Sequence, residues 1–128
     1  MRSNETVRKP LLQSLVPILP ARDMARSVAF YQRLGFSCEP YEDGQHYAFL
    51  TMGDVSAHLR LGGPKEFASN PGGVYLYVED VEAFFKQVTS AGISTLDAPE
   101  DKPWGMREFA VSDPDETLLR IGERSGSL

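Results

Sequence analysis

Residues 80–92 of the chain read DVEAFFKQVTSAG, and residues 23–35 read DMARSVAFYQRLG. Each stretch opens on an aspartate, whose carboxylate can accept the free N–H groups of a helix's first turn. Each closes on a glycine, which is favoured just past a helix C-terminus because φ is often positive there. The apolar residues of the later stretch recur at helical spacing, at Val81, Phe84, Phe85 and Val88. The two stretches therefore predict two helices of equal length.

The segments around these helices predict a repeat of strand, helix, strand, strand and strand. Asp23 and Asp80 are 57 residues apart, and an apolar run suited to a strand precedes each of them. Phe36 and Ile93, the residues that follow the terminal glycines, are also suited to strands. The strands predicted in the first half are at residues 15–19, 36, 47–52 and 55–61. Those predicted in the second half are at residues 74–78, 93, 106–112 and 118–122.

The repeat predicts an α+β fold of two βαβββ modules, each a mixed sheet with its helix on one face. We expect the modules at about residues 14–64 and 71–123, together forming a single domain over residues 14–123. Residues 62–73 are rich in glycine and proline, which predicts a linker between the modules. Residues 1–13 are largely polar and charged and are predicted to be an N-terminal tail.

Composition excludes several classes of function. The chain has 128 residues and no apolar run near the ~20 residues of a membrane span, so no membrane partner is expected. Its net charge of −5 argues against a nucleic-acid partner and is compatible with a cationic small molecule. Cys38 is the single cysteine, so no internal disulfide is available, which favours a cytoplasmic location. No phosphate loop, dinucleotide motif, zinc spacing or nucleophile elbow is present.

The alternation of side chains along three predicted strands places aromatic and cationic residues on the sheet faces away from the helices. In residues 74–78 the aliphatic side chains suit the helix-packed face, which leaves Tyr75 and Tyr77 on the other face. His58 and Arg60 oppose aliphatic neighbours in the same way, as does Arg120. Rings with polar tips beside a few cations are typical of a ligand-binding surface. They would equally suit a subunit interface, so both interpretations stay open.

Two groups of motifs resemble the bleomycin resistance proteins of the vicinal oxygen chelate superfamily, which includes glyoxalase I and extradiol dioxygenases. The first group comprises VPILPARD at residues 16–23, FY at residues 30–31 and LGF at residues 34–36. The second comprises PWGMREF at residues 103–109 and DPD at residues 113–115. The resemblance covers nearly the whole chain after the first dozen residues. It implies the superfamily's fold, in which paired mixed sheets curve inward and carry their helices on the outer face.

The resemblance also indicates where a metal would bind. In the metalloenzymes of the superfamily, inward side chains hold a divalent metal at positions that correspond here to Val16, His58, Gly73 and Arg120. Only His58 is a metal ligand by type, because valine and glycine have no donor atom and a guanidinium stays protonated. The other histidine, His46, lies in a predicted turn or strand start. We therefore expect no bound metal, no cofactor and no metal-dependent catalysis.

Resistance proteins of this family act without catalysis. The resemblance implies a homodimer that sequesters a cationic aromatic ligand in clefts between its subunits, with a bleomycin-type antibiotic as one candidate. No catalytic residue is predicted. The predicted ligand-binding residues are Tyr75, Tyr77, Trp104, His58, Arg60, Arg120, Tyr41 and Glu39.

Two other functions fit the same sequence. The first is a lyase- or oxidoreductase-like member of the superfamily with an unknown substrate. Its acid, base or anion-holding groups would be His58, Arg60, Arg120 and Glu108. The second is a protein whose own ligand is an unrelated metabolite or another protein.

Glu116 departs from the family pattern, in which the Asp-Pro-Asp turn usually continues with glycine. If the backbone at this position has a positive φ, a glutamate there costs up to ~1 kcal/mol.

Overall fold

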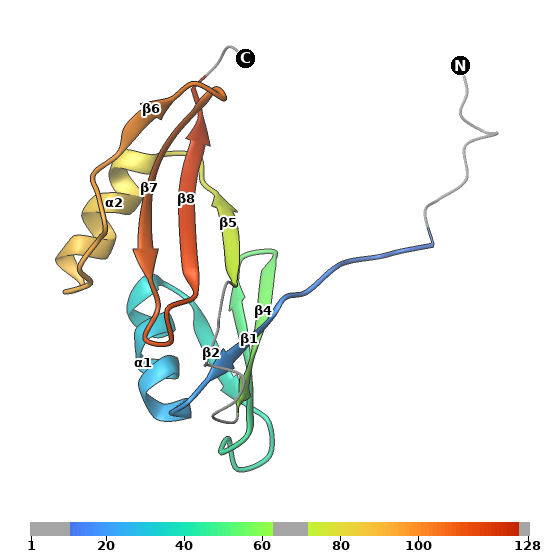
Figure 1. Cartoon of the computed structure of the whole chain (residues 1–128). Helices are drawn as coiled ribbons and strands as arrows, with labels where there is room; N and C mark the ends of the chain where they lie inside the picture. Colours follow the sequence, from blue (N-terminus) through green and yellow to red (C-terminus); the bar gives the residue numbers. More distant parts are fainter. Residues whose placement is uncertain (1–10, 63–71, 126–128) are drawn as a thin grey trace.

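The computed structural model describes residues 11–62 and 72–125, which form two four-stranded sheets and two helices (Figure 1). The strand order is β1-β4-β3-β2 in one sheet and β5-β8-β7-β6 in the other. Both modules therefore have the same topology, with a parallel pair at one edge and antiparallel neighbours beyond it. This confirms the predicted α+β fold of two βαβββ modules. Most of the predicted linker and tail lies outside the described residues.

The elements of the first module are β1 (Ile18–Ala21), α1 (Met24–Leu34), β2 (Ser37–Pro40), β3 (Tyr47–Met52) and β4 (Val55–Leu61). Those of the second module are β5 (Gly73–Tyr77), α2 (Val81–Ser90), β6 (Glu100–Lys102), β7 (Met106–Ser112) and β8 (Leu118–Arg124). The strands predicted at residues 47–52, 55–61 and 106–112 have the predicted bounds, and those predicted at 74–78 and 118–122 differ from the observed bounds by one or two residues.

Both helices begin and end as their sequences predict. The carboxylates of Asp23 and Asp80 each accept a hydrogen bond of 3.0 Å from the backbone N–H three residues further on. Gly35 and Gly92, just past the two helices, have φ of 122° and 86°. A side chain is strained at such angles, so glycine is the residue that ends each helix at low cost.

Of the two strands predicted directly after the helices, the first begins one residue late, at Ser37, and the second is wrong, because Phe36 and Ile93 close the helices instead. The N–H groups of Phe36 and Ile93 donate to the carbonyls of Tyr31 and Val88 at 2.9 and 3.2 Å, respectively. Both side chains are buried in the core. In the second module the second strand comes only at the charged segment Glu100–Lys102, which was not predicted. Charged residues are common on edge strands, which must not pair with other chains.

The first strand was predicted too early, at residues 15–19. The observed strand begins at Ile18, whose register partner is His58 on β4. Pro17 has no N–H to donate to a ladder, although its carbonyl accepts from the His58 N–H at 2.9 Å. The chain before Pro17 therefore runs outside the sheet.

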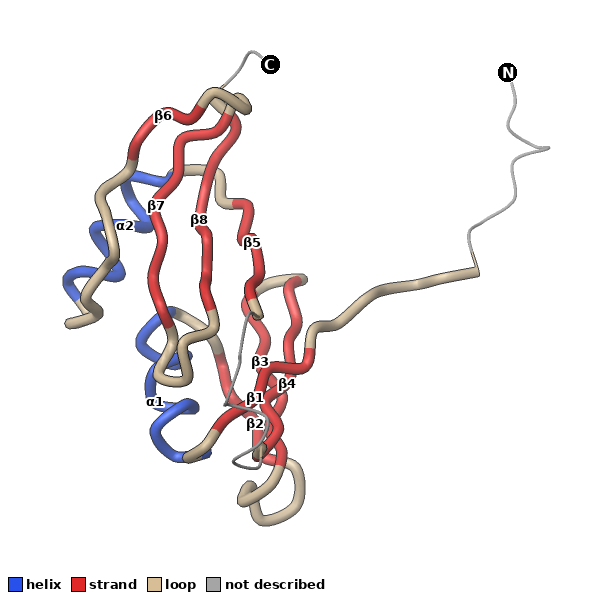
Figure 2. The backbone as a smooth tube through the Cα atoms, viewed as in Figure 1, coloured by secondary structure: helices blue, strands red, loops and turns tan. Residues whose placement is uncertain are grey.

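Both helices lie on the same side of the two sheets, which leaves the opposite sheet faces uncovered (Figure 2). One continuous core fills the space beneath the helices, and both modules contribute to it. Its largest fully buried aliphatic and aromatic residues are Tyr31, Leu34, Leu50, Leu59, Val81, Val88, Phe109, Val111, Leu119 and Ile121.

The turn between β7 and β8 ties the second module to α1 of the first through two buried aspartates. The Tyr31 hydroxyl donates to Asp113 at 2.7 Å. Arg26 and Ser27 donate to the Asp115 carboxylate at 3.0 and 3.2 Å. Burial raises the pKa of Asp113. These contacts hold the turn in place and fix the backbone of Glu116, which follows Asp115.

Glu116 has a φ of 67°, so the left-handed backbone suspected from the sequence is present. Replacing it by glycine is expected to raise the free energy of unfolding by up to ~1 kcal/mol, because glycine adopts this conformation without a steric penalty. Urea denaturation measures the change. The control is Glu79→Gly, at an exposed position without a positive φ, which should be neutral or destabilising. If Glu116→Gly were no more stable than the parent protein, the positive φ of Glu116 would not destabilise the fold.

Candidate functional site

The uncovered face of the second sheet contains a buried carboxylate beneath aromatic and cationic side chains. Glu108 on β7 is only 1% exposed. Its Oε1 accepts hydrogen bonds from the Tyr75 hydroxyl at 2.7 Å and from the Trp104 indole N–H at 3.0 Å. Its Oε2 accepts from Arg120 Nη1 at 3.2 Å. We call this group, with Tyr77 and Arg124, the aromatic wall.

Strand pairing brings these side chains together. Tyr75 on β5 lies opposite Arg120 on β8, and Glu108 lies opposite Gly122 on the other side of β8. The missing side chain of Gly122 makes room between them. A Cβ built there would overlap the Tyr75 hydroxyl and lie 2.9 Å from the Glu108 Cβ. Glycine at this position therefore permits the hydrogen bond between Tyr75 and Glu108 across β8.

The rings of the aromatic wall contact neighbouring side chains of the second module on one side and are open to solvent on the other. Tyr75 and Tyr77 have ring centroids 4.8 Å apart, with planes tilted by 39°. The guanidinium of Arg124 lies 5.2 Å from the centroid of the Tyr77 ring. Tyr77 and Trp104 remain 64% and 50% exposed. Exposed rings whose positions are already fixed suit the stacking of a planar ligand.

The protonation states of the wall follow from its contacts. Burial by itself raises the pKa of Glu108, but the hydrogen bonds from Tyr75, Trp104 and Arg120 outweigh it and hold the pKa below its ordinary value of 4.5. Burial and the hydrogen bond to Glu108 raise the pKa of Tyr75. At neutral pH the carboxylate is therefore ionised and the tyrosine keeps its proton, so the hydrogen bonds of the wall are all charge-assisted.

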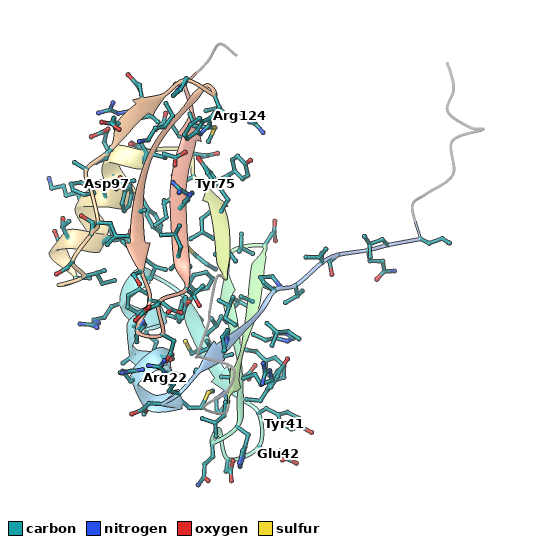
Figure 3. All side chains as sticks on the ribbon, viewed as in Figure 1. Arg22, Tyr41, Glu42, Tyr75, Asp97 and Arg124 are labelled. Atoms are coloured by element: carbon teal, nitrogen blue, oxygen red, sulfur yellow. The ribbon has the colours of Figure 1, made fainter. Side chains whose placement is uncertain are left out.

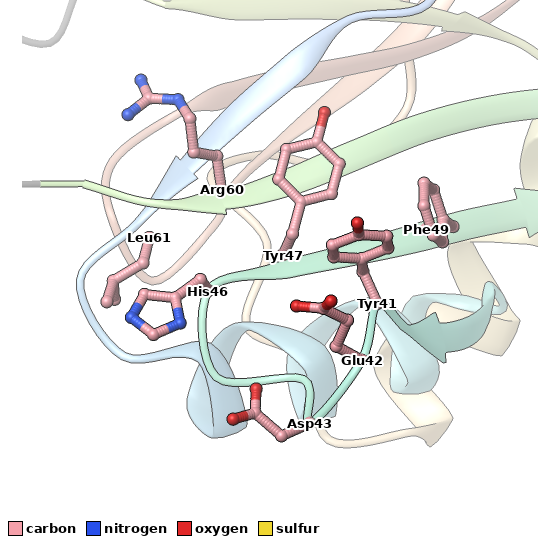
Figure 4. A pocket seen from close by; sticks show the side chains of 8 residues that line it. All are labelled: Tyr41, Glu42, Asp43, His46, Tyr47, Phe49, Arg60 and Leu61. Carbon is pink, nitrogen blue, oxygen red and sulfur yellow. The ribbon is translucent and has the colours of Figure 1, made fainter.

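The uncovered face of the first sheet has an aromatic cluster of its own. The Tyr47 hydroxyl and His58 Nδ1 are 2.8 Å apart, within hydrogen-bond distance. The rings of Tyr41, Tyr47, Phe49 and His58 meet edge to face, with centroids 5.0 to 6.5 Å apart. A cavity of about 600 Å³ lies beside them (Figure 4). Its lining residues are Tyr41, Glu42, Asp43, His46, Tyr47, Phe49, Arg60 and Leu61.

The predicted ligand-binding residues thus fall into two groups on different sheets. Tyr75, Tyr77, Trp104 and Arg120 belong to the second module, whereas Tyr41, His58, Arg60 and Glu39 belong to the first. Figure 3 labels one member of each group, Tyr75 on the upper sheet and Tyr41 near the lower end of the molecule. Within one chain they do not form a single site.

The acid–base alternative loses support for the same reason. His58 and Arg60 lie on β4 of the first sheet, while Glu108 and Arg120 face each other on the second. His58 contacts Tyr47 rather than a carboxylate among the described residues. One chain therefore does not bring the four suggested acid–base groups together.

Sequence reasoning missed two members of the wall. Glu108 was considered only as an acid or base, although alternation along Met106–Ser112 indicates that it lies on the same face as the ligand-binding residues. Arg124 was missed because the last strand continues past the predicted end at residue 122. Two further residues of β8, Arg120 and Gly122, share its face by the same alternation.

At the four positions that correspond to metal ligands in the superfamily, the structure shows no arrangement of side chains that points toward a common metal. Val16 precedes β1, and Gly73 begins β5. His58 lies beside the Tyr47 hydroxyl, and Arg120 donates to Glu108. Within residues 11–62 and 72–125, no three His, Cys, Asp or Glu side chains are grouped as a metal-binding set.

In the same residues, none of the helices has the length and apolar character needed to cross a membrane.

The paired βαβββ modules define a glyoxalase-like class of protein, and comparison with known proteins identifies the family within it. The chain belongs to the Glyoxalase/Bleomycin resistance protein/Dioxygenase superfamily, whose family model matches residues 12–121. The resemblance predicted from the sequence motifs is thereby confirmed.

Sequence relatives and solved structures point to the same branch. A bleomycin resistance protein of Klebsiella pneumoniae is 33% identical over 120 residues, covering 82% of this chain and 87% of the relative. One of Staphylococcus aureus is 29% identical over 127 residues, covering 85% and 94%. The structure of a bleomycin-binding protein complexed with bleomycin is 29% identical, with a TM-score of 0.76, and covers 88% of this chain and 99% of that one.

Replacing Glu108 by glutamine is expected to lower the free energy of unfolding at pH 7 by about 1–3 kcal/mol, because the amide loses the charge and turns an N–H group toward Arg120. The folded-state pKa of Glu108 is depressed, so its contribution is complete above the ordinary value of 4.5 and is lost as pH falls through the depressed pKa. The difference between the two proteins should therefore shrink in acid.

Denaturant titrations at a series of pH values measure this difference. Glu100→Gln is the matched control, since that exposed glutamate forms a surface ion pair with Lys102 and its loss should stay within ~0.5 kcal/mol. If Glu108→Gln lowered the free energy of unfolding by the same amount at all pH values, Glu108 would not be ionised in the folded protein.

Proposed function

We propose that this protein is a metal-free binding protein that sequesters a cationic, planar aromatic drug of the bleomycin type in clefts at a dimer interface. The observation that carries the proposal is that Trp104 is held by a buried carboxylate and yet remains 50% exposed. Binding gains affinity when the contacting groups are ordered beforehand, because less entropy is then lost. A fixed, exposed indole supported in this way is suited to stacking against a flat ligand.

The relatives support bleomycin as the class of drug. The Klebsiella pneumoniae relative is named a bleomycin resistance protein, and one structural neighbour is named a bleomycin-binding protein in complex with bleomycin. The alignments with both extend over most of each chain.

The two separate clusters within one chain support a site that needs two copies. If the first sheet of one copy packs on the second sheet of the other, a twofold contact forms this pairing twice. The ring of Tyr41 and the carboxylates of Glu42 and Asp43 would then face the partner's Trp104. Such a cleft has aromatic surfaces for stacking on both sides, and its acidic rim suits a cation.

The N-terminal segment supports a dimer independently. Leu11, Leu12 and Leu15 are 100%, 72% and 82% exposed, and Ile18 is 53% exposed. The segment extends away from the body of the chain (Figure 1). Burial of apolar surface contributes about 25 cal/mol per Å². A run of exposed apolar residues on an extended segment is well suited to packing on a second copy.

Sedimentation velocity at micromolar concentration is expected to give twice the chain mass of 14.2 kDa. Serine at both Leu11 and Leu15 should shift the protein toward monomer, because it removes apolar contact area. Leu96→Ser is the control, since Leu96 is 61% exposed but lies in the loop after α2. A wild-type protein that sediments as a 14.2 kDa monomer would contradict the intersubunit clefts.

Trp104→Ala is expected to weaken bleomycin binding about ten- to hundredfold, since loss of an aromatic stacking partner costs ~1–3 kcal/mol. Tyr77→Ala should act in the same direction, and His58→Ala should have a smaller effect. Isothermal titration calorimetry measures all three, with Leu96→Ala as the surface control. Circular dichroism checks that each variant is folded.

Thermal shifts with bleomycin, and with zinc, nickel and ferrous ions as a second arm, distinguish binding from metal-dependent function. A ligand that binds the native state raises the melting temperature by mass action. We expect a rise with the drug and none with the metals. Unchanged affinity in Trp104→Ala, or stabilisation by a metal alone, would refute the proposal.

A further inference from the structure

The aromatic wall is rich in hydrogen-bond donors and poor in acceptors. Glu108 is its central carboxylate, and donors within the chain already occupy both of its oxygens. The Trp104 N–H and the Tyr75 hydroxyl proton are likewise directed at Glu108. A ligand cation that reached the wall would therefore find this carboxylate already neutralised and enclosed.

Arg120 is the main polar group that the wall still offers. One of its nitrogens donates to Glu108 at 3.2 Å, and its side chain is 49% exposed. A guanidinium carries several N–H donors in a rigid plane, and the described residues accept from only one of its nitrogens. Arg120 is thus oriented by a buried partner while its remaining donors are open to the uncovered face.

Arg124 adds further donors to the same face of β8. Its guanidinium lies over the Tyr77 ring, and no residue within 11–62 or 72–125 accepts a hydrogen bond from it. The remaining charged pair on this side is Lys102 with Glu100, at 2.6 Å on the edge strand β6. Glu108 is paired with Arg120, and Glu100 is paired with Lys102. The charges of these two pairs cancel, so the positive charge of Arg124 remains on the wall.

We propose that Arg120 and Arg124 make this wall selective for a planar aromatic group that bears an oxygen acceptor, a carbonyl or carboxylate, at its edge. The ring stacks on the exposed indole of Trp104 while the oxygen accepts hydrogen bonds from Arg120. The inference rests on the proposed function, since it uses the same wall. It assigns the cationic part of the ligand to the acidic rim of the other sheet, at Glu42 and Asp43.

The test uses four naphthalene probes that differ only in the substituent: naphthoate, naphthamide, naphthalene itself and naphthylmethylammonium. Trp104 is the single tryptophan of the chain, so quenching of its fluorescence reports binding at the wall. We expect affinity to fall in the order carboxylate, carboxamide, unsubstituted ring, ammonium. Charge-assisted hydrogen bonds are roughly twice as strong as neutral ones, and we expect about a tenfold gap between the carboxylate and the ammonium.

Three variants locate the selectivity. Arg120→Gln should remove most of the preference for naphthoate over naphthylmethylammonium. Arg124→Gln should reduce it less, and it leaves the Glu108 ion pair intact, so it remains informative if Arg120→Gln is unstable. Arg107→Gln is the control, because Arg107 on β7 is ion-paired with Glu82 and Asp101 outside the wall.

Two results would overturn the selectivity, namely equal or stronger binding of the ammonium probe, or no quenching by any probe. If bleomycin still binds in a Trp104-dependent manner in that case, the proposed function stands and only the selectivity is wrong. If bleomycin binding is absent as well, the proposed function fails with it.

Discussion

The carboxylate of Glu108 is the group on which the uncovered face of the second sheet depends. A buried carboxylate without partners costs several kcal/mol, so its three donors are required for the fold to tolerate it. The same three hydrogen bonds fix the directions of Tyr75, Trp104 and Arg120. The side-chain-free backbone of Gly122 leaves the space in which this arrangement fits. One ionised group thus orders a surface that extends over several strands.

This arrangement also explains how a superfamily that includes metalloenzymes can provide a binding surface of a different kind. At the position of Arg120, the resemblance to the family's metalloenzymes places a metal ligand. A guanidinium there brings a permanent positive charge, and Glu108 neutralises it from within the sheet. Arg120 and Glu108 thus form an ion pair at this position, and the rings of Tyr75 and Trp104 lie beside it. In the proposed function, affinity for a flat ligand would follow from stacking and from the donors of Arg120 that do not contact Glu108.

The sequence predicted the fold where its signals were local. Asp23 and Asp80 marked the helix starts, and alternation identified most strands, because caps and side-chain period are properties of a few neighbouring residues. The segment Glu100–Lys102 was missed because three charged residues have no strand preference, and it is a strand only through pairing with β7. Ile93 was mistaken for the start of a strand because an apolar residue that packs over a helix end has no sequence signal that distinguishes it from a strand residue.

The sequence indicated which residues line the candidate site, but not which of them lie next to one another in the structure. Alternation indicates the face on which Tyr75 or His58 lies, but the pairing of strands decides which residues become neighbours. The division of the predicted residues between two sheets, and the position of Glu108 beneath Trp104, depend on contacts between residues distant in the sequence. Such contacts leave no local pattern.

A crystal structure of the protein with bleomycin would show directly whether the drug binds on Trp104 between two copies. We expect a flat ring system of the drug stacked on Trp104 in a cleft that Tyr41 of a second copy completes. A drug molecule bound within a single chain away from Trp104, or held through a protein-bound metal ion, would contradict it.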